Sequence, residues 1–225
     1  MPNIEAQIYP NGISQRNLVD LLYMLFSSFK GVCVKLDLDD NTDNTYEAKA
    51  YTAIFNGYIE DSRGNSIQNR ANDGATPPVY VTDERFFIIT PQGIDDKSLL
   101  ECLYQWFDMM ETLTEQLDAD DATTSNYEAL IYTAIYLWIV ENCKGSQLGN
   151  GTVYYFRPGG VFNYNQLIDL LYAMVYSWEK LTEKLDTDAV PAGSNYEALW
   201  FTATVTMRVQ NSMGSVVGNT ITVTP

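Results

Sequence analysis

The chain has 225 residues, of which 46% are hydrophobic, and it contains no histidine. Its 13 basic and 29 acidic residues give a net charge of −16, which excludes a general nucleic-acid binder, because such a protein needs a basic face to neutralise phosphates. Without histidine the chain lacks the commonest general base, the commonest metal ligand and every Ser-His or Cys-His nucleophile. We therefore expect a protein that is not an enzyme and needs no cofactor.

The first predicted element is a short strand that ends at a proline turn. Gln7-Ile8-Tyr9 leads into Pro10-Asn11-Gly12. Proline presets φ for a turn and glycine allows φ > 0, so the strand is expected to stop there. The same kind of run leads into a proline three more times along the chain, at Pro91-Gln92-Gly93, Pro158-Gly159-Gly160 and Pro225.

Each of the first three runs is followed by apolar residues in alternating steps of four and three. This spacing places them on one stripe of an α-helix and predicts helices over about residues 15–35, 95–117 and 163–185. Ser14 and either Asn163 or Asn165 are expected as N-caps, and Gly31 is expected to end or kink the first helix. The three ladders are Leu18, Leu22, Leu25, Phe29, Val32, Leu36; Leu99, Leu103, Trp106, Met110, Leu113, Leu117; and Leu167, Leu171, Met174, Trp178, Leu181, Leu185.

An Asp-x-Asp linker and a long strand are predicted after each helix. The linkers are Asp37-Leu38-Asp39, Asp118-Ala119-Asp120 and Asp186-Thr187-Asp188. The strands are expected over about residues 49–60, 130–141 and 199–210. In the third of these, threonines alternate with apolar residues, and a period of two indicates a strand. Each long strand is expected to form a β-hairpin with the next short strand.

Together these elements predict an α+β fold in a single compact domain over residues 1–225. It is expected to consist of three tandem repeats, each made of a short strand, a Pro-x-Gly turn, a long amphipathic helix, an Asp-x-Asp linker and a long strand. Residues 61–82 are polar and are expected to form an exposed inserted loop. The modules and the closing strand are expected at about 4–60, 84–141, 152–210 and 219–225.

The N-terminal strand has no long strand before it in the chain, unlike the other short strands. An unpaired sheet edge recruits strands from other chains unless it is blocked. This predicts a homo-oligomer with Ile4, Ile8 and Tyr9 at the interface. The alternative is that the N-terminal strand closes onto another module of the same chain.

Four residues after the first helix resemble the first half of a calcium-binding loop: Asp37, Asp39, Asn41 and Asp43. The segment lacks the glycine of the sharp turn, and Glu47 falls one place short of the bidentate ligand. The favoured interpretation is a carboxylate turn that bonds backbone amides. No metal site is therefore nominated.

Other residues have simpler interpretations. Three cysteines without metal spacing are expected to be apolar filler, and three matched tyrosines are expected to pack against the helices instead of binding glycans. Four glutamates leave glycoside hydrolysis by paired carboxylates open, although nothing singles out two of them. No apolar run approaches the roughly 20 residues of a membrane span, so no membrane contact is expected. The cysteines are Cys33, Cys102 and Cys143, the tyrosines are Tyr46, Tyr127 and Tyr196, and the glutamates are Glu101, Glu111, Glu128 and Glu197.

Two segments resemble a module of tailed-bacteriophage virion proteins, including the crAss-like podoviruses of gut bacteria. The module reads L-x-x-K-L-D-A-D-x-G-V-x-x-x-[DN]-Y, and the similar segments are 113–129 and 181–198. The first copy departs from it, with Leu38 in place of alanine.

This resemblance implies a non-enzymatic structural component of the virion, such as a head fibre, a decoration protein or a ring at the portal or tail. It would be synthesised in the host bacterial cytoplasm and assemble with capsid, portal or tail proteins in multiple copies. The alternative is an outward-displayed carbohydrate- or cell-surface-binding module, which requires exposed aromatic residues beside the loops at 61–82, 142–150 and 211–219. A hydrolase that uses carboxylates alone is the third interpretation.

Overall fold

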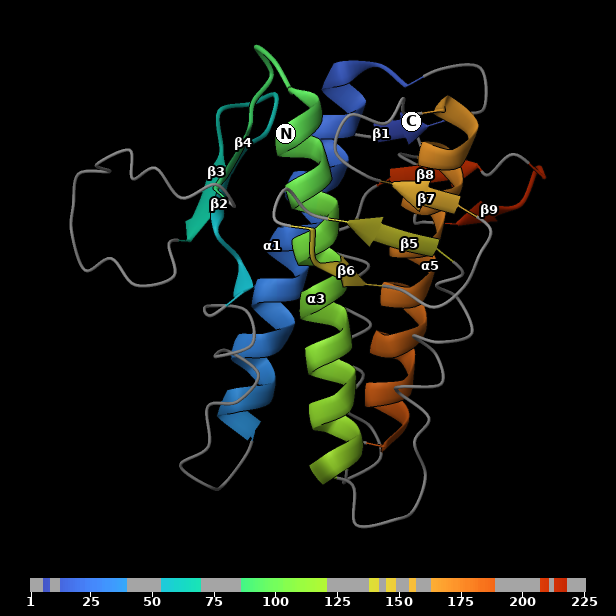
Figure 1. Ribbon diagram of the computed structural model, residues 1–225. Helices are drawn as coiled ribbons and strands as arrows, with labels where there is room; N and C mark the ends of the chain where they lie inside the picture. Colours follow the sequence, from blue (N-terminus) through green and yellow to red (C-terminus); the bar gives the residue numbers. More distant parts are fainter. Residues whose placement is uncertain are drawn as a thin grey trace, which may run out of the picture.

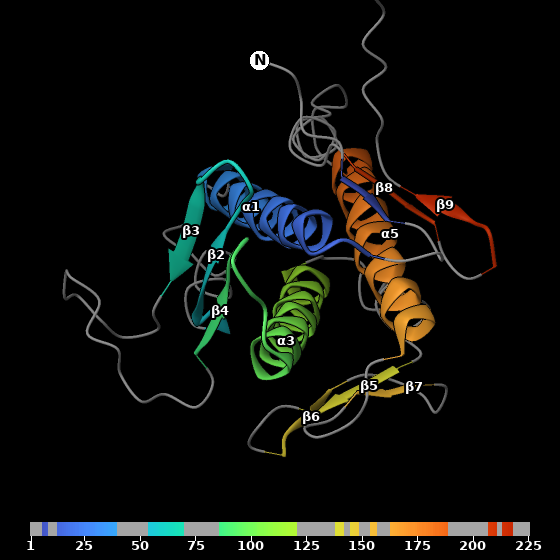
Figure 2. The same cartoon turned by 90° about the horizontal axis from the view of Figure 1, so that it is seen from above.

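The computed structural model describes residues 6–8, 13–39, 54–69, 86–120, 138–141, 145–148, 154–156, 163–188, 207–210 and 213–217. Three helices of 25 residues dominate it: α1 (Gln15–Asp39), α3 (Asp96–Asp120) and α5 (Tyr164–Asp188). They lie side by side and run in the same direction, with small sheets around one end of the bundle (Figures 1 and 2). The α+β fold class is therefore confirmed.

The N-terminus of each helix is capped by the residue just before it. Asn17 donates its backbone N–H to Ser14 Oγ over 3.1 Å, Ser98 to Asp95 Oδ1 over 2.7 Å, and Asn165 to Asn163 Oδ1 over 2.9 Å. Each bond satisfies a backbone donor that has no partner within the helix. Ser14 and Asn163 are thus confirmed as N-caps.

The helices extend further than the ladders predict. Each ends at the second aspartate of its Asp-x-Asp segment, so these segments are the last helical residues and not linkers. An end of the helix at Gly31, one of the two expected outcomes there, is also wrong, since α1 continues to Asp39. Val32 and Cys33 are 1% exposed, and this burial holds the helix together where its local propensity is weak.

Nine short strands form three sheets among the described residues, and every sheet has the same arrangement. The sheet orders are β3-β2-β4, β6-β5-β7 and β1-β8-β9. In each sheet the central strand has one antiparallel and one parallel neighbour. The strands are β1 (Ala6–Ile8), β2 (Gly57–Glu60), β3 (Ser66–Asn69), β4 (Phe87–Ile89), β5 (Trp138–Glu141), β6 (Gln147–Leu148), β7 (Tyr154–Phe156), β8 (Met207–Gln210) and β9 (Val216–Val217).

The predicted hairpins are wrong in their pairing. The next short strands, β4 and β7, pair with β2 and β5 in parallel, and the antiparallel partners are β3 and β6. The first part of the expected inserted loop, 61–69, is therefore a tight turn and a strand. The first predicted long strand is also too long, because Ile54 is helical and β2 starts at Gly57.

The N-terminal strand closes onto the third sheet of the same chain. Gln7 of β1 is in register with Arg208 of β8, and the pairing is parallel, as between β4 and β2. The alternative in which the N-terminal strand closes onto another part of the same chain is thus correct. The expectation that this strand leaves a sheet edge unpaired within the chain is wrong. The predicted closing strand at 219–225 lies outside the described residues.

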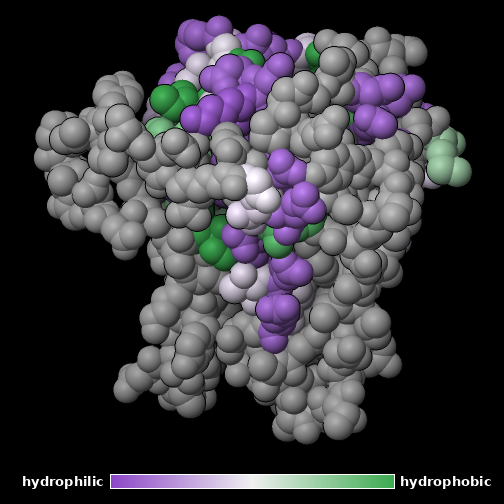
Figure 3. All heavy atoms as spheres, in the orientation of Figure 1, coloured by the Kyte–Doolittle hydropathy of each residue, from purple (hydrophilic) through white to green (hydrophobic). Residues whose placement is uncertain are grey.

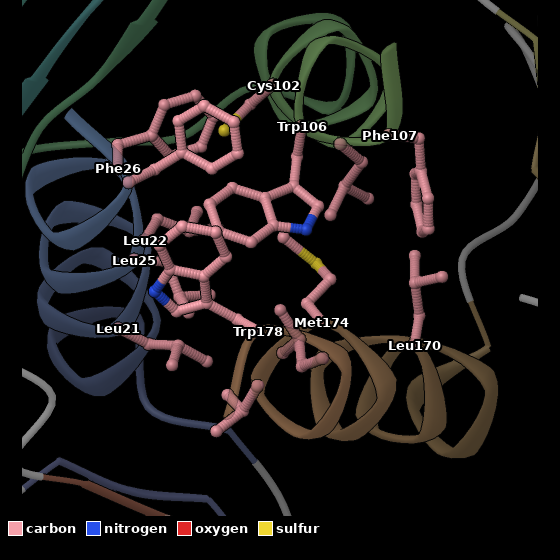
Figure 4. Packing of buried hydrophobic residues seen from close by; sticks show 14 of the residues in the cluster. Leu21, Leu22, Leu25, Phe26, Cys102, Trp106, Phe107, Leu170, Met174 and Trp178 are labelled. Atoms are coloured by element: carbon pink, nitrogen blue, oxygen red, sulfur yellow. The ribbon is translucent and has the colours of Figure 1, made fainter. Parts of the chain in front are cut away.

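The core lies between the three helices and is rich in aromatic rings (Figure 4). The rings of Phe29 and Trp178 stack with centroids 4.9 Å apart, and Trp106 meets Trp178 edge-on at 6.0 Å. Trp178 also donates its indole N–H to Ser28 Oγ over 2.9 Å. Because these residues come from α1, α3 and α5, the described helices share one core.

One stretch of α1 meets the length and composition of a membrane span, contrary to the sequence expectation. Residues Gln15–Val34 form this stretch, and 67% of it is buried within the protein. Leu21, Leu25 and Phe26 are 0% exposed, which is the environment of a core helix in a globular protein.

Candidate assembly surface

The outermost features of the sheets are three hairpin turns, each with a glycine in the left-handed region. Gly64, Gly145 and Gly214 have φ of 84°, 81° and 88°. A residue with a Cβ is disfavoured at such φ, so these glycines fix where the turns form. All three turns share one sequence signal, an Asp or Asn three residues before the glycine, at Asp61, Asn142 and Asn211.

In the first turn, Asp61 organises the backbone. Its Oδ1 accepts the N–H groups of Arg63 and Asn65 over 2.9 and 2.7 Å, and its Oδ2 accepts the side-chain amide of Asn65. Asp61 is only 5% exposed. An aspartate that bonds backbone two residues ahead forms an Asx turn, so the turn is locally specified.

A buried aspartate ties the first turn to its helix. Asp20 of α1 is 2% exposed and accepts both the backbone N–H of Ser62 over 2.7 Å and the Ser62 hydroxyl over 2.8 Å. Arg16 lies 3.8 Å from the same carboxylate. Because both oxygens of Asp20 are used, the hairpin is fixed on the helix surface.

Tyrosines lie beside the sheets on all three helices. Burial raises the pKa of Tyr23, Tyr104 and Tyr172, and neighbouring acidic groups raise each pKa further: Asp61 for Tyr23, Asp108 for Tyr104, and Tyr176 and Glu179 for Tyr172. Tyr104 is 8% exposed and belongs to the core, while Tyr23 and Tyr172 are partly buried and pack against it.

The third hairpin differs from the other two in its surface. Met213 at its tip is 89% exposed and Val216 on β9 is 43% exposed. The corresponding tip residues of the first two hairpins are Arg63 and Lys144. In the orientation of Figure 1, hydrophobic surface lies at the position of this hairpin, at the right-hand edge of the molecule (Figure 3).

Of the four residues that resemble a calcium-binding loop, the structure describes two. Asp37 and Asp39 lie in the last turn of α1, and Asn41 and Asp43 lie outside the described residues. Within the described part of the chain, no group of three or more potential metal-binding side chains is present.

The predicted interface residues are only partly described. Ile8 lies in β1, in register with Val209 of the same chain, and Ile4 and Tyr9 lie outside the described residues. Contact of this strand with another chain stays a prediction. Cys33 and Cys102 are buried, as expected of apolar filler, and Cys143 lies outside the described residues.

The glutamates considered for hydrolysis do not form a pair where they are described. Glu101 and Glu111 lie on the same helix, ten residues apart, which corresponds to about 15 Å along its axis. Glycosidases place their two carboxyl groups about 5 to 9.5 Å apart, so this pair does not fit. Glu128, Glu197 and the three matched tyrosines Tyr46, Tyr127 and Tyr196 lie outside the described residues.

Comparison of the chain with protein families, with curated proteins and with solved structures finds no match.

Proposed function

We propose that this chain is a non-enzymatic structural component of a tailed-phage virion, a head fibre, decoration protein or portal or tail ring protein, which assembles in multiple copies. The proposal rests on the two segments that resemble the phage module. The described parts of those segments form the last turns of α3 and α5.

The chain would be built from three tandem modules closed into a ring. Three capped helices of equal length, three sheets of the same order and three turns with a positive-φ glycine support this arrangement. In repeat proteins each unit contacts its neighbours through a constant interface. Here that interface would be the parallel strand pair.

The structural observation that supports this arrangement is that every described sheet joins strands from two of the proposed modules. The strand before α3 pairs with β2, the strand before α5 pairs with β5, and the strand before α1 pairs with β8. Asn56 also donates its backbone N–H to Gln105 of α3 over 2.7 Å, and Gln15 of α1 donates to the Pro91 carbonyl over 3.2 Å. A body interlocked in this way is suited to bearing load in a particle.

The carbohydrate-binding alternative gains less support. It requires exposed aromatic rings at the hairpin loops, but the large hydrophobic residues exposed in the described part of the chain are all aliphatic: Val34, Ile88, Met213 and Val216. Tyr58, near the first loop, is partly buried and donates its hydroxyl to Glu60.

The test is the location of the protein and of its gene. We expect antibodies against the purified protein to label tailed phage particles at a defined place, and the gene to lie among portal and terminase genes. Absence from particles, together with a gene neighbourhood free of virion genes, would contradict the proposal. A glycan array tests the alternative, for which specific binding to one sugar class is expected.

A further inference from the structure

We propose that two copies of this chain join edge to edge through β9, so that their sheets become continuous. The inference rests on the proposed function, which requires contacts between copies, and it identifies the surface that makes one of them. The partner is a second copy of the same chain.

β9 is the last strand of its sheet, and no described strand pairs with its outer edge. Its two residues alternate as in a half-buried strand. Val217 is 5% exposed and pairs with the fully buried Val209, whereas Val216 is 43% exposed. The strand is therefore anchored through Val217 while Val216 stays exposed, and β9 lies at the periphery of the described elements (Figure 2).

The third hairpin lacks the charges that protect its counterparts. Residues 211–219 contain no charged side chain, whereas the first turn contains Asp61 and Arg63 and the second contains Lys144. Charged side chains, lysine above all, are the usual means by which soluble proteins block edge-to-edge pairing. Among the described residues of the three hairpins, those of the hairpin ending in β9 combine an edge without a described partner strand with exposed apolar side chains, and this hairpin carries no such charge.

The charge of the whole chain favours this edge as the meeting place of two copies. Each copy carries a net charge of −16, so most of its surface repels another copy. The uncharged hairpin is where two copies approach with the least repulsion. An edge strand is also self-complementary, because two antiparallel copies related by a twofold axis exchange the same backbone hydrogen bonds.

Contact at this edge would cover the exposed Met213 and Val216 side chains of both copies. Burial of apolar surface adds to the backbone hydrogen bonds of the new strand pair. β9 has two residues, so the dimer should be weak at low concentration and should form readily where copies are crowded.

The experiment compares the association of the full chain with that of two lysine variants by sedimentation velocity over a range of concentrations. Val216→Lys places a charge on the proposed edge. Gln147→Lys is the matched control, since Gln147 pairs with Glu141 in the second sheet as Val216 pairs with Gln210 in the third. We expect a concentration-dependent dimer, a dissociation constant raised at least tenfold by Val216→Lys, and no change with Gln147→Lys.

A crosslinking arm shows whether the contact is at β9 itself. In a Cys143→Ser background, Val216→Cys should give a covalent dimer with a short bismaleimide, and Gln147→Cys should not. A strictly monomeric protein, equal effects of the two lysine variants or equal crosslinking of the two cysteine variants would overturn the inference. These outcomes do not depend on whether the protein occurs in virions, so the inference and the proposed function fail separately.

Discussion

Among single residues, Gly57 is explained by close packing, whereas Gly64, Gly145 and Gly214 are explained by the geometry of their turns. A Cβ atom on Gly57 would lie 2.5 Å from the Phe87 ring, well inside contact distance. Phe87 is 0% exposed and its ring lies 5.7 Å from that of Phe55. The parallel register pairs Gly57 with Phe87, so a residue without a side chain makes room for the ring.

Gly57→Ala should destabilise the protein by about 1–3 kcal/mol through overpacking. The measurement is the midpoint of urea unfolding. Phe87→Leu in the same chain should recover part of this loss, because the smaller side chain leaves room for the methyl group. A Gly57→Ala variant as stable as the parent would contradict the packing explanation.

Two half-buried glutamates make stability depend on pH. Burial raises the pKa of Glu111 and of Glu179, and neighbouring Glu115 and Glu183 respectively raise them further. The folded protein therefore binds protons at pH values where the unfolded chain has released them. This contribution to stability is complete below the ordinary glutamate pKa and is lost as the pH rises through the folded-state pKa.

Glu111→Gln and Glu179→Gln should each raise the urea midpoint at pH 7, since the neutral amide avoids the cost of ionising a half-buried group. The gain should shrink as the pH is lowered toward the ordinary glutamate pKa, where the parent carboxyl is also neutral. Unfolding curves at several pH values, recorded in dilute solution because the isoelectric point is about 4.1, provide the test. A gain that is constant with pH would rule out the titration as its cause.

At the scale of elements, matched helix positions carry matched burial. Leu22 of α1, Leu103 of α3 and Leu171 of α5 occupy the same rung of the three ladders, and each is 0% exposed. The aromatic residues are matched only in part, since Phe29 and Trp178 share the fourth rung whereas Trp106 stands on the third. The described core therefore combines leucines at matched positions with an aromatic cluster at partly matched ones.

Replacement of Leu22, Leu103 or Leu171 by alanine should cost about 2–5 kcal/mol in each case, through lost apolar burial and the cavity left behind. The three losses should be similar if the chain is built from the three modules proposed above. The free energy of unfolding of the three variants, measured side by side, tests this. One variant with almost no loss would indicate that its helix does not share the common core.

At the scale of the whole molecule, the chain is closed by the pairing of its first strand with its third sheet. This contact joins β1 to β8 across nearly the full length of the sequence, and β1 also lies against α1. Contacts between distant parts of a chain cost more entropy to form than local ones. The β1–β8 pair is therefore where the fold is expected to open first.

Deletion of residues 1–9 should lower the melting temperature and expose the edge of β8. Hydrogen exchange of the backbone amides in Met207–Gln210 should accelerate, because these amides lose a neighbouring strand. Gly57–Glu60 and Trp138–Glu141 hold the same position in the other two sheets and serve as internal controls that should change less. Unchanged protection of β8 would mean that β1 contributes little to closure.

Elements with a local signal could be predicted from the amino-acid sequence. The apolar ladders predict three helices, and Ser14 and Asn163 are short polar caps; both signals depend only on nearby residues. The composition adds that no histidine is present to serve as a general base or metal ligand. Tertiary structure alone decided the helix ends, the parallel pairing of β4 with β2 and the closure by β1. A strand pattern shows which face is buried but not which neighbour is bonded, and a helix continues past its apolar ladder whenever packing supports the next turn.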